Sequence, residues 1–319
     1  MIDNESLLWV IFSASVFILL ALDLGVFHRK SHAIGIKEAM IWSAIWLAVA
    51  VVFNVIVYFW QGQETAMEFA AAYIVERSLS VDNLFVFLLI FSYFKVPAVH
   101  QYRVLFWGIL AALILRAVFI ITGITLIQNF HWLIYLFGAF LIYTGIKIAF
   151  KKEDDGADLS QNRVLKWSKK VLPTVEHYDG GRFFSKYAGK WVVTPMFLVL
   201  LVVETSDLIF ALDSVPAVLG VTLDPFVAYT SNIFAILGLR ALYFALAGCM
   251  LMFRFLSGGI TLILIFVGAK MLVSGFYEVP VEIALGVIML VLAIAIGLSV
   301  MIPGQKEGHA QKRSEPGSK

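Results

Sequence analysis

The 319-residue sequence is poor in charged residues and contains a single cysteine, Cys249. Only 14% of its residues are charged while 61% are hydrophobic, a balance that excludes a soluble domain of this size. One cysteine excludes an intramolecular disulfide. The first residues lack a basic stretch and a small-residue cleavage site, so we expect the first apolar run to be retained as a helix. Nothing in the composition indicates a nucleic-acid partner.

Apolar runs of about 20 residues recur along the chain, and a helix of that length can cross a bilayer. They predict an all-α polytopic membrane protein with about nine transmembrane helices. The spans are expected near residues 7–27, 39–60, 69–94, 104–127, 132–150, 191–219, 226–253, 258–277 and 279–302. The chain then divides into spans one to five (1–150), a polar loop (151–190), spans six to nine (191–302) and a polar tail (303–319) predicted to be disordered.

Basic residues occur in alternate connections between these spans. Lys and Arg lie between spans one and two, three and four, five and six, and seven and eight, and again in the tail, whereas the other connections have none. By the positive-inside rule this places the N-terminus outside and the C-terminus inside, which an odd number of spans requires. The loop 151–190, with nine Lys and Arg residues, is therefore expected in the cytoplasm.

Span six contains an acidic motif, Glu204-Thr-Ser-Asp-Leu-Ile-Phe-Ala-Leu-Asp-Ser-Val-Pro216. A charge at the bilayer centre costs about 2.5 to 3.5 kcal/mol on insertion scales, so such acids are usually functional. On an unbroken helix Glu204 and Asp207 lie about 60° apart, whereas Asp213 lies about 180° from Glu204. Because Pro216 removes a helical hydrogen bond, we expect the helix to break there and to turn Asp213 toward the other acids.

Span three contains a second acidic motif, Glu76-Arg-Ser-Leu-Ser-Val-Asp-Asn83, where a similar break is expected. Because an unpaired buried charge is costly, we expect Arg116 in span four and Arg240 in span seven to neutralise some of the carboxylates. A static core of such ion pairs is the alternative to a functional cluster. The predicted metal-binding residues are Glu76, Asp82, Asn83, Glu204, Asp207 and Asp213, with Arg116, Arg240, Ser80, Ser214 and Pro216 in supporting positions.

Three short motifs occur twice, in the same order. Gly138-Ala-Phe-Leu-Ile-Tyr-Thr-Gly145 in span five matches Gly268-Ala-Lys-Met-Leu-Val-Ser-Gly275 in span eight, Leu-Arg-Ala occurs in spans four and seven, and Val-Glu-x-Ser occurs in spans three and six. Spans three to five (about 69–150) therefore form a repeat of spans six to eight (about 191–277). Since each unit has three spans, the second is inverted in the membrane, as in many secondary transporters.

The acidic motifs offer only oxygen ligands, with no His or Cys among them. Oxygen ligands suit Mn²⁺, Ca²⁺ or Mg²⁺, whereas Cu⁺ and Zn²⁺ prefer thiolate or imidazole. Carboxylates that share a low-dielectric site tend to retain protons, so exchange of the metal for protons is the coupling that this chemistry favours. No prosthetic group is expected. The predicted partners are the transported cation, protons and the lipid bilayer.

At the two acidic motifs the sequence resembles the TerC family of bacterial integral membrane proteins, particularly its Alx-like branch. The resemblance extends over roughly residues 7–300, and Arg77 departs from the lysine of many relatives while keeping the charge. It implies manganese efflux across the inner membrane, which selects Mn²⁺ where ligand type alone does not. It also implies that the functional acids are Glu76, Asp82, Glu204, Asp207 and Asp213. The family takes its name from a link to tellurite resistance.

These observations favour an inner-membrane secondary transporter that exports Mn²⁺ in exchange for protons. A Ca²⁺/H⁺ exchanger is one alternative, and a membrane scaffold linked to metal or tellurite stress is another, although a scaffold needs no duplicated acidic motif. An intramembrane aspartyl protease is the enzymatic alternative. Its usual Gly-x-Gly-Asp motif is absent, as are His-Glu-x-x-His and Gly-x-Ser-x-Gly, so we do not expect an enzyme.

Overall fold

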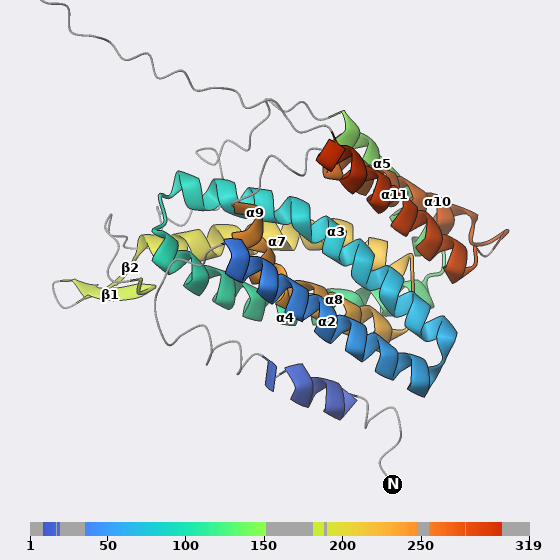
Figure 1. The fold of residues 1–319 in the computed structure, drawn as a ribbon, viewed down its shortest axis with the longest axis horizontal. Coiled ribbons are helices and arrows are strands. Elements are labelled where there is room, and N and C mark those ends of the chain that lie inside the picture. Colours follow the sequence, from blue (N-terminus) through green and yellow to red (C-terminus); the bar gives the residue numbers. More distant parts are fainter. Residues whose placement is uncertain are drawn as a thin grey trace, which may run out of the picture.

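The computed structural model describes residues 9–16, 18–19, 36–150, 181–187, 190–247, 255–277 and 279–301, without the side chains of Asp82, Phe85 and six others. It is a bundle of long helices with one short hairpin at its end (Figure 1). The helices are α2 (Ile36–Gln61), α3 (Gln63–Tyr93), α4 (Ala98–Asn129), α5 (Leu133–Ala149), α7 (Pro195–Leu219), α8 (Pro225–Leu237), α9 (Leu239–Ala247), α10 (Leu256–Val273) and α11 (Val281–Met301). Residues 9–16 are also helical.

Each predicted span from the second to the ninth contains a helix, while about half of the first span, most of the loop 151–190 and all of the tail lie outside the described residues. Five helical segments of the described chain are long and apolar enough to cross a membrane. They are Ile36–Gln61, Ala98–Asn129, Pro195–Leu219, Pro225–Ala245 and Val281–Ser299. Helix α3, with 31 residues, is also long enough, but its apolar stretch is interrupted by the acidic motif. Nine spans and their orientation stay predictions.

Helices α2 and α11 present apolar side chains to the outside of the bundle. On α2, Val52 is 60% exposed and Phe59 is 81% exposed, and on α11 Leu290 is 61% exposed. Contiguous apolar surface of this extent is unfavourable in water but matches the hydrocarbon of a bilayer. The outer surface is therefore that of an integral membrane protein that crosses the bilayer more than once.

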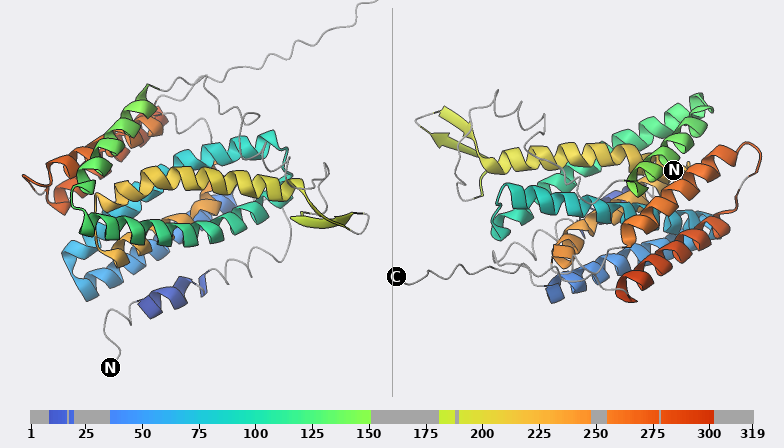
Figure 2. Two further views of the ribbon diagram at one scale, coloured as in Figure 1. Left: turned by 180° about the vertical axis from the view of Figure 1, so that it is seen from behind. Right: turned by 90° about the horizontal axis from the view of Figure 1, so that it is seen from above.

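Helices from the two halves of the chain pack against each other. Helix α3 contacts α7 and α8, helix α4 contacts α7, and helix α5 contacts α10; Figure 2 shows α4 and α7 side by side. Helices α5 and α10 approach each other closely, because a Cβ atom added to Gly268 would lie 2.6 Å from the carbonyl oxygen of Gly138. A Cβ atom on Gly138 would lie 2.8 Å from the carbonyl oxygen of Gly268. The two motif glycines thus let these helices touch through their backbones.

The prediction that residues 191–219 form one helical span is wrong at its beginning. Strands β1 (Phe184–Tyr187) and β2 (Lys190–Val193) form an antiparallel hairpin in which Phe184 pairs with Val193. Trp and Val favour strands, and the hydropathy of this run alone does not distinguish strand from helix. The helix begins only at Pro195, whose fixed φ suits the first helical position.

The predicted breaks at the acidic motifs are also wrong. Helix α3 is continuous through Glu76 and Asp82, and α7 is continuous through Pro216 to its end at Leu219. Pro216 lies in the last turn of α7, so only three helical residues follow the lost hydrogen bond. A break occurs instead at Gly238, between α8 and α9. There the guanidinium of Arg77 takes the space of a missing Cβ atom, and its Nη1 donates to the carbonyl oxygen of Ala235 at 2.8 Å.

Candidate functional site

A buried ion pair lies where α3, α4, α7 and α8 meet. Glu76 on α3 is 0% exposed and Arg116 on α4 is 1% exposed. Arg116 Nη1 donates to Glu76 Oε1 at 2.7 Å and to the hydroxyl oxygen of Ser214, on α7, at 2.6 Å. Arg116 Nη2 lies 3.9 Å from Asp207 Oδ1, also on α7. The predicted pairing of Arg116 with membrane acids is therefore confirmed, and it involves one acid from each motif.

Asn232 on α8 is a further member of this cluster, and it is absent from the site residues predicted from the sequence. Its Nδ2 donates to Glu76 Oε2 at 3.1 Å, and the residue is fully buried. Its Oδ1 is buried and accepts no hydrogen bond from the described residues. The signal was present as Thr-Ser-Asn at 230–232, a polar triplet inside an otherwise apolar span. Polar residues in such spans usually face the interior of the bundle.

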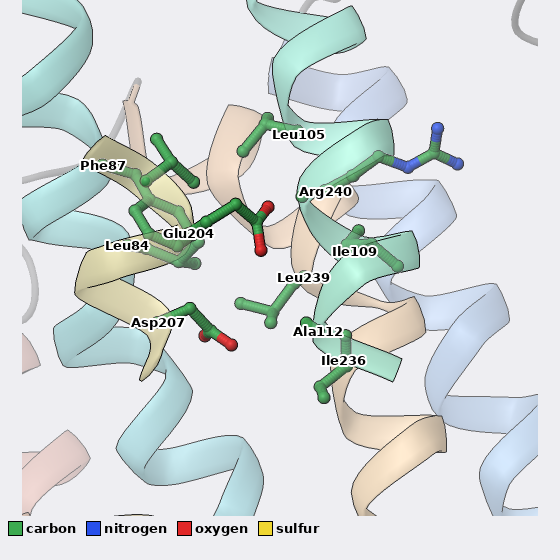
Figure 3. A pocket seen from close by; sticks show the side chains of 12 residues that line it. Leu84, Phe87, Leu105, Ile109, Ala112, Glu204, Asp207, Ile236, Leu239 and Arg240 are labelled. Atoms are coloured by element: carbon green, nitrogen blue, oxygen red, sulfur yellow. The ribbon is translucent and has the colours of Figure 1, made fainter. Parts of the chain in front are cut away.

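Two acids of the second motif line a small cavity of about 20 Å³ between α3, α4, α7, α8 and α9. Glu204 and Asp207 project into it from α7, and the apolar side chains of the other helices surround them (Figure 3). Both carboxylate oxygens of Glu204 and Oδ2 of Asp207 are buried, and no described group donates a hydrogen bond to them. A cavity of roughly 10–15 Å³ suffices for one water molecule. This cavity therefore has room for one water molecule or one ion of similar size beside two carboxylates.

One of the residues that line the cavity close to Glu204 is a glycine. A Cβ atom on Gly108 of α4 would lie 3.2 Å from Glu204 Oε1, so α4 approaches the carboxylate closely. Arg240 also lines the cavity, but Figure 3 shows its guanidinium turned away from Glu204 and Asp207. That group lies over the ring of Tyr102, 4.8 Å from the ring centroid. Its cation–π contact attaches α9 to α4.

Asp213 lies on another side of α7. Its Oδ1 accepts a hydrogen bond from the hydroxyl of Thr144, on α5, at 3.1 Å, and the residue is half-buried. The expectation that Asp213 turns toward the other acids depended on a break at Pro216. Because α7 stays helical through Pro216, Asp213 keeps its helical direction, about 180° from Glu204.

The remaining predicted residues lie on α3 beside the cluster. Ser80 is buried, and its hydroxyl lies 3.5 Å from Glu76 Oε1. Asn83 is 5% exposed. Asp82 belongs to the same helix, but its side chain is outside the described part of the structure. Pro216 is buried one turn from the end of α7.

No three described Asp, Glu, His or Cys side chains are arranged to hold a metal ion together. The acids are instead distributed around Arg116, whose guanidinium contacts Glu76 and approaches Asp207. Buried carboxylates without hydrogen-bond donors, as at Glu204, are costly unless a cation or a proton neutralises them. The chemistry of these acids therefore suits a cation or a proton, and the guanidinium of Arg116 lies between Glu76 and Asp207.

Comparison with known proteins identifies the family. The sequence profile of the integral membrane protein TerC family matches residues 61–307, which include both acidic motifs and all of the helices from α3 to α11. The chain belongs to the TerC family. The resemblance inferred from the acidic motifs is therefore confirmed.

Relatives of this TerC-family protein match it over nearly its whole length. An uncharacterized membrane protein of Myxococcus xanthus is 47% identical over 305 residues, which cover 95% of this chain and 93% of its own. A protein of Escherichia coli named "putative membrane-bound redox modulator Alx" is 42% identical over 306 residues, or 93% of this chain and 95% of its own. An uncharacterized membrane protein of Rickettsia bellii is 39% identical, covering 92% and 97%. No solved structure matches.

Proposed function

We propose that this protein is a secondary transporter of the bacterial inner membrane that exports Mn²⁺ in exchange for protons. The observation that carries the proposal is the pair of Glu204 and Asp207, which face a cavity of about 20 Å³ inside the bundle with three carboxylate oxygens that accept no hydrogen bond from the described residues. A carboxylate in such a place is costly unless a cation or a proton accompanies it. Alternation between these two partners is the basis of a metal–proton exchange.

In this proposal the guanidinium of Arg116 competes with the transported cation for the carboxylates of Glu76 and Asp207. This guanidinium occupies the position between Glu76 and Asp207, so its single positive charge balances one of these two carboxylates when no metal is bound. A divalent cation that enters beside Glu204 and Asp207 displaces the guanidinium from Asp207, where the present separation of 3.9 Å makes the contact weak. Asp82, Asn83 and Asp213 then supply further oxygen ligands in a conformation different from the one described here.

The helix contacts support an inverted repeat. If α3, α4 and α5 correspond to α7, α8–α9 and α10, the contact of α3 with α8 corresponds to the contact of α4 with α7. Helices α5 and α10 are each other's equivalents in the two repeats, and they contact each other directly. Gly138 and Gly268, the first residues of the repeated motif, meet in this contact. Contact between equivalent residues is expected on a two-fold axis. Transporters built in this way hold their substrates at the interface of the repeats, where the acids of this chain lie.

The choice of Mn²⁺ depends on family and ligand chemistry together. Oxygen ligands alone also accept Ca²⁺ or Mg²⁺, and the family resemblance favours Mn²⁺. The name of the E. coli relative indicates a redox role for that protein. In this chain one cysteine cannot form an internal disulfide, so a dithiol mechanism has no pair of residues to use.

The test is metal flux into liposomes that contain the purified protein and a trapped dye quenched by Mn²⁺. We expect Mn²⁺ uptake above that of protein-free liposomes. The uptake should be faster when the liposome interior is more acidic than the medium, because protons then leave as Mn²⁺ enters. Uptake of Ca²⁺ and Mg²⁺ should be slower. Uptake of Ca²⁺ in preference to Mn²⁺ would establish the Ca²⁺/H⁺ exchanger instead. Absence of flux of all three metals, with and without the gradient, contradicts the transporter and favours the scaffold.

A further inference from the structure

A second cavity, of about 510 Å³, opens at the surface between the start of α4 and the hairpin β1–β2, and its lining residues are distinct from those of the acidic site. Arg103 and Trp107 of α4 form one wall, and Arg182 and Phe184 form the other. In Figure 2 the hairpin projects beyond the end of the bundle, next to the place where α4 and α7 begin. None of the described residues that line this cavity is acidic.

The wall formed by residues 181–184 is fixed in place by contacts with α4 and α7. Gly181 has φ +75°, and a Cβ atom there would lie 2.6 Å from Nδ1 of His100, so only glycine lets the segment approach α4 this closely. Arg103 Nη1 donates to the carbonyl oxygen of Gly181 at 3.2 Å. The ring of Phe184 packs on Phe197 of α7, with centroids 5.0 Å apart. The cavity is thus a defined feature of the fold.

The cavity combines positive charge with exposed aromatic rings. The guanidinium of Arg103 has five N–H donors, so it can keep its bond to Gly181 and still hold a phosphate oxygen. Arg182 adds a second positive charge at the rim. On the hairpin, Tyr187 and Trp191 are each 65% exposed. Exposed Trp and Tyr side by side with basic residues are typical of the membrane–water interface, where they lie at the level of the lipid headgroups.

An apolar stripe continues from the cavity along α4. Trp107, Ile114, Val118 and Ile121 are exposed by 49%, 64%, 57% and 61%, and their spacing places them within about 60° on one helix face. A free phosphate ion uses none of this stripe, whereas the acyl chains of a lipid need such a surface next to the headgroup. The distribution of basic residues predicts that this end of the bundle is cytoplasmic, the side on which anionic lipids give the membrane surface its negative potential.

We propose that this cavity binds one anionic phospholipid, with its phosphate on Arg103 and Arg182 and its acyl chains along the exposed face of α4. The site is separate from the acids of the proposed transport pathway, so it can be tested whether or not the protein moves metal. The lipid would hold the hairpin, and with it the start of α7, at the membrane interface.

The experiment is native mass spectrometry of the full-length protein, delipidated in a neutral detergent and titrated with phosphatidylglycerol, phosphatidylcholine, glycerol phosphate or inorganic phosphate. We expect one tightly held phosphatidylglycerol per chain and weaker adducts with the other three. Equal retention of phosphatidylcholine, or binding of glycerol phosphate as tight as that of phosphatidylglycerol, overturns the proposal. These comparisons use the wild-type protein and do not depend on the folding of a variant.

Matched variants locate the site. Arg103→Gln should weaken phosphatidylglycerol binding about tenfold or more, because a charge-assisted hydrogen bond is lost. Arg103→Lys, which keeps the positive charge but loses the planar guanidinium and its parallel donors, should retain part of the affinity. Lys37→Gln removes one exposed positive charge at the start of α2 and should change the affinity by less than about twofold. Equal effects of Arg103→Gln and Lys37→Gln would show that the lipid is held by net charge and not by this cavity.

Discussion

Replacing Arg116 with Met tests whether the buried ion pair stabilises the bundle. Arg116 is 1% exposed and Glu76 is 0% exposed, so the variant leaves a carboxylate in a low-dielectric interior without the guanidinium that contacts it. Removal of one partner of a buried pair typically costs about 3–5 kcal/mol. We expect a decrease of that size in the free energy of unfolding, measured by titration with sodium dodecyl sulfate in mixed micelles. The lost bond from Arg116 to Ser214 adds to the effect.

A second substitution separates charge from packing. In the double variant Arg116→Met, Glu76→Gln the charge of the Glu76 carboxylate is gone, while the new amide oxygen still accepts from Asn232. We expect most of the lost stability to return, which gives a large coupling energy in the double-mutant cycle. Lys37→Met, at an exposed position, should change the free energy of unfolding by less than about 0.5 kcal/mol. A single variant that costs less than about 1 kcal/mol, or a double variant no more stable than the single one, would show that the Glu76–Arg116 pair does not stabilise the bundle.

Two further predictions concern other parts of the bundle. Gly268→Ala should destabilise the protein by about 1–3 kcal/mol, because its Cβ atom would lie 2.6 Å from the carbonyl oxygen of Gly138. The control is Gly286→Ala on α11, which has open space around it and should not destabilise the protein in the same unfolding titration. Equal effects would contradict the close contact of α5 and α10. Asp213→Asn keeps the acceptor for the hydroxyl of Thr144, so the free energy of unfolding should change by less than about 1 kcal/mol. Mn²⁺ flux should nevertheless be lost, and normal flux would remove Asp213 from the site.

The helices could be predicted from the sequence because apolar length determines them directly. The run predicted at 39–60 is α2 at Ile36–Gln61, and the run at 104–127 lies inside α4. The hairpin was missed because Trp191 and the two valines after it are as apolar as the helix that follows. Hydropathy reports burial or lipid contact, and it does not distinguish the two kinds of backbone.

The site could be predicted only in part because side-chain direction depends on neighbouring helices. The cost of an unpaired charge predicts that Arg116 pairs with a membrane carboxylate, and the structure shows that this carboxylate belongs to Glu76. The break between α8 and α9 could not be located from the sequence. Pro216 suggested a break in α7, but proline is tolerated in the last turn of that helix. The break at Gly238 depends on the guanidinium of Arg77, which fills the space that a Cβ atom would take. Asn232 reaches Glu76 only through the contact of α8 with α3, which no local pattern specifies.

In the proposed function the cavity beside Glu204 and Asp207 holds the transported cation. The most direct test of this assignment is the rate of Mn²⁺ uptake into liposomes by Glu204→Gln, compared with that by Glu282→Gln at an exposed position in the first turn of α11. Both substitutions remove one carboxylate charge and keep the shape of the side chain. We expect Glu204→Gln to reduce the rate to the level of protein-free liposomes and Glu282→Gln to leave it unchanged. Wild-type uptake by folded Glu204→Gln protein would show that this cavity does not hold the transported cation.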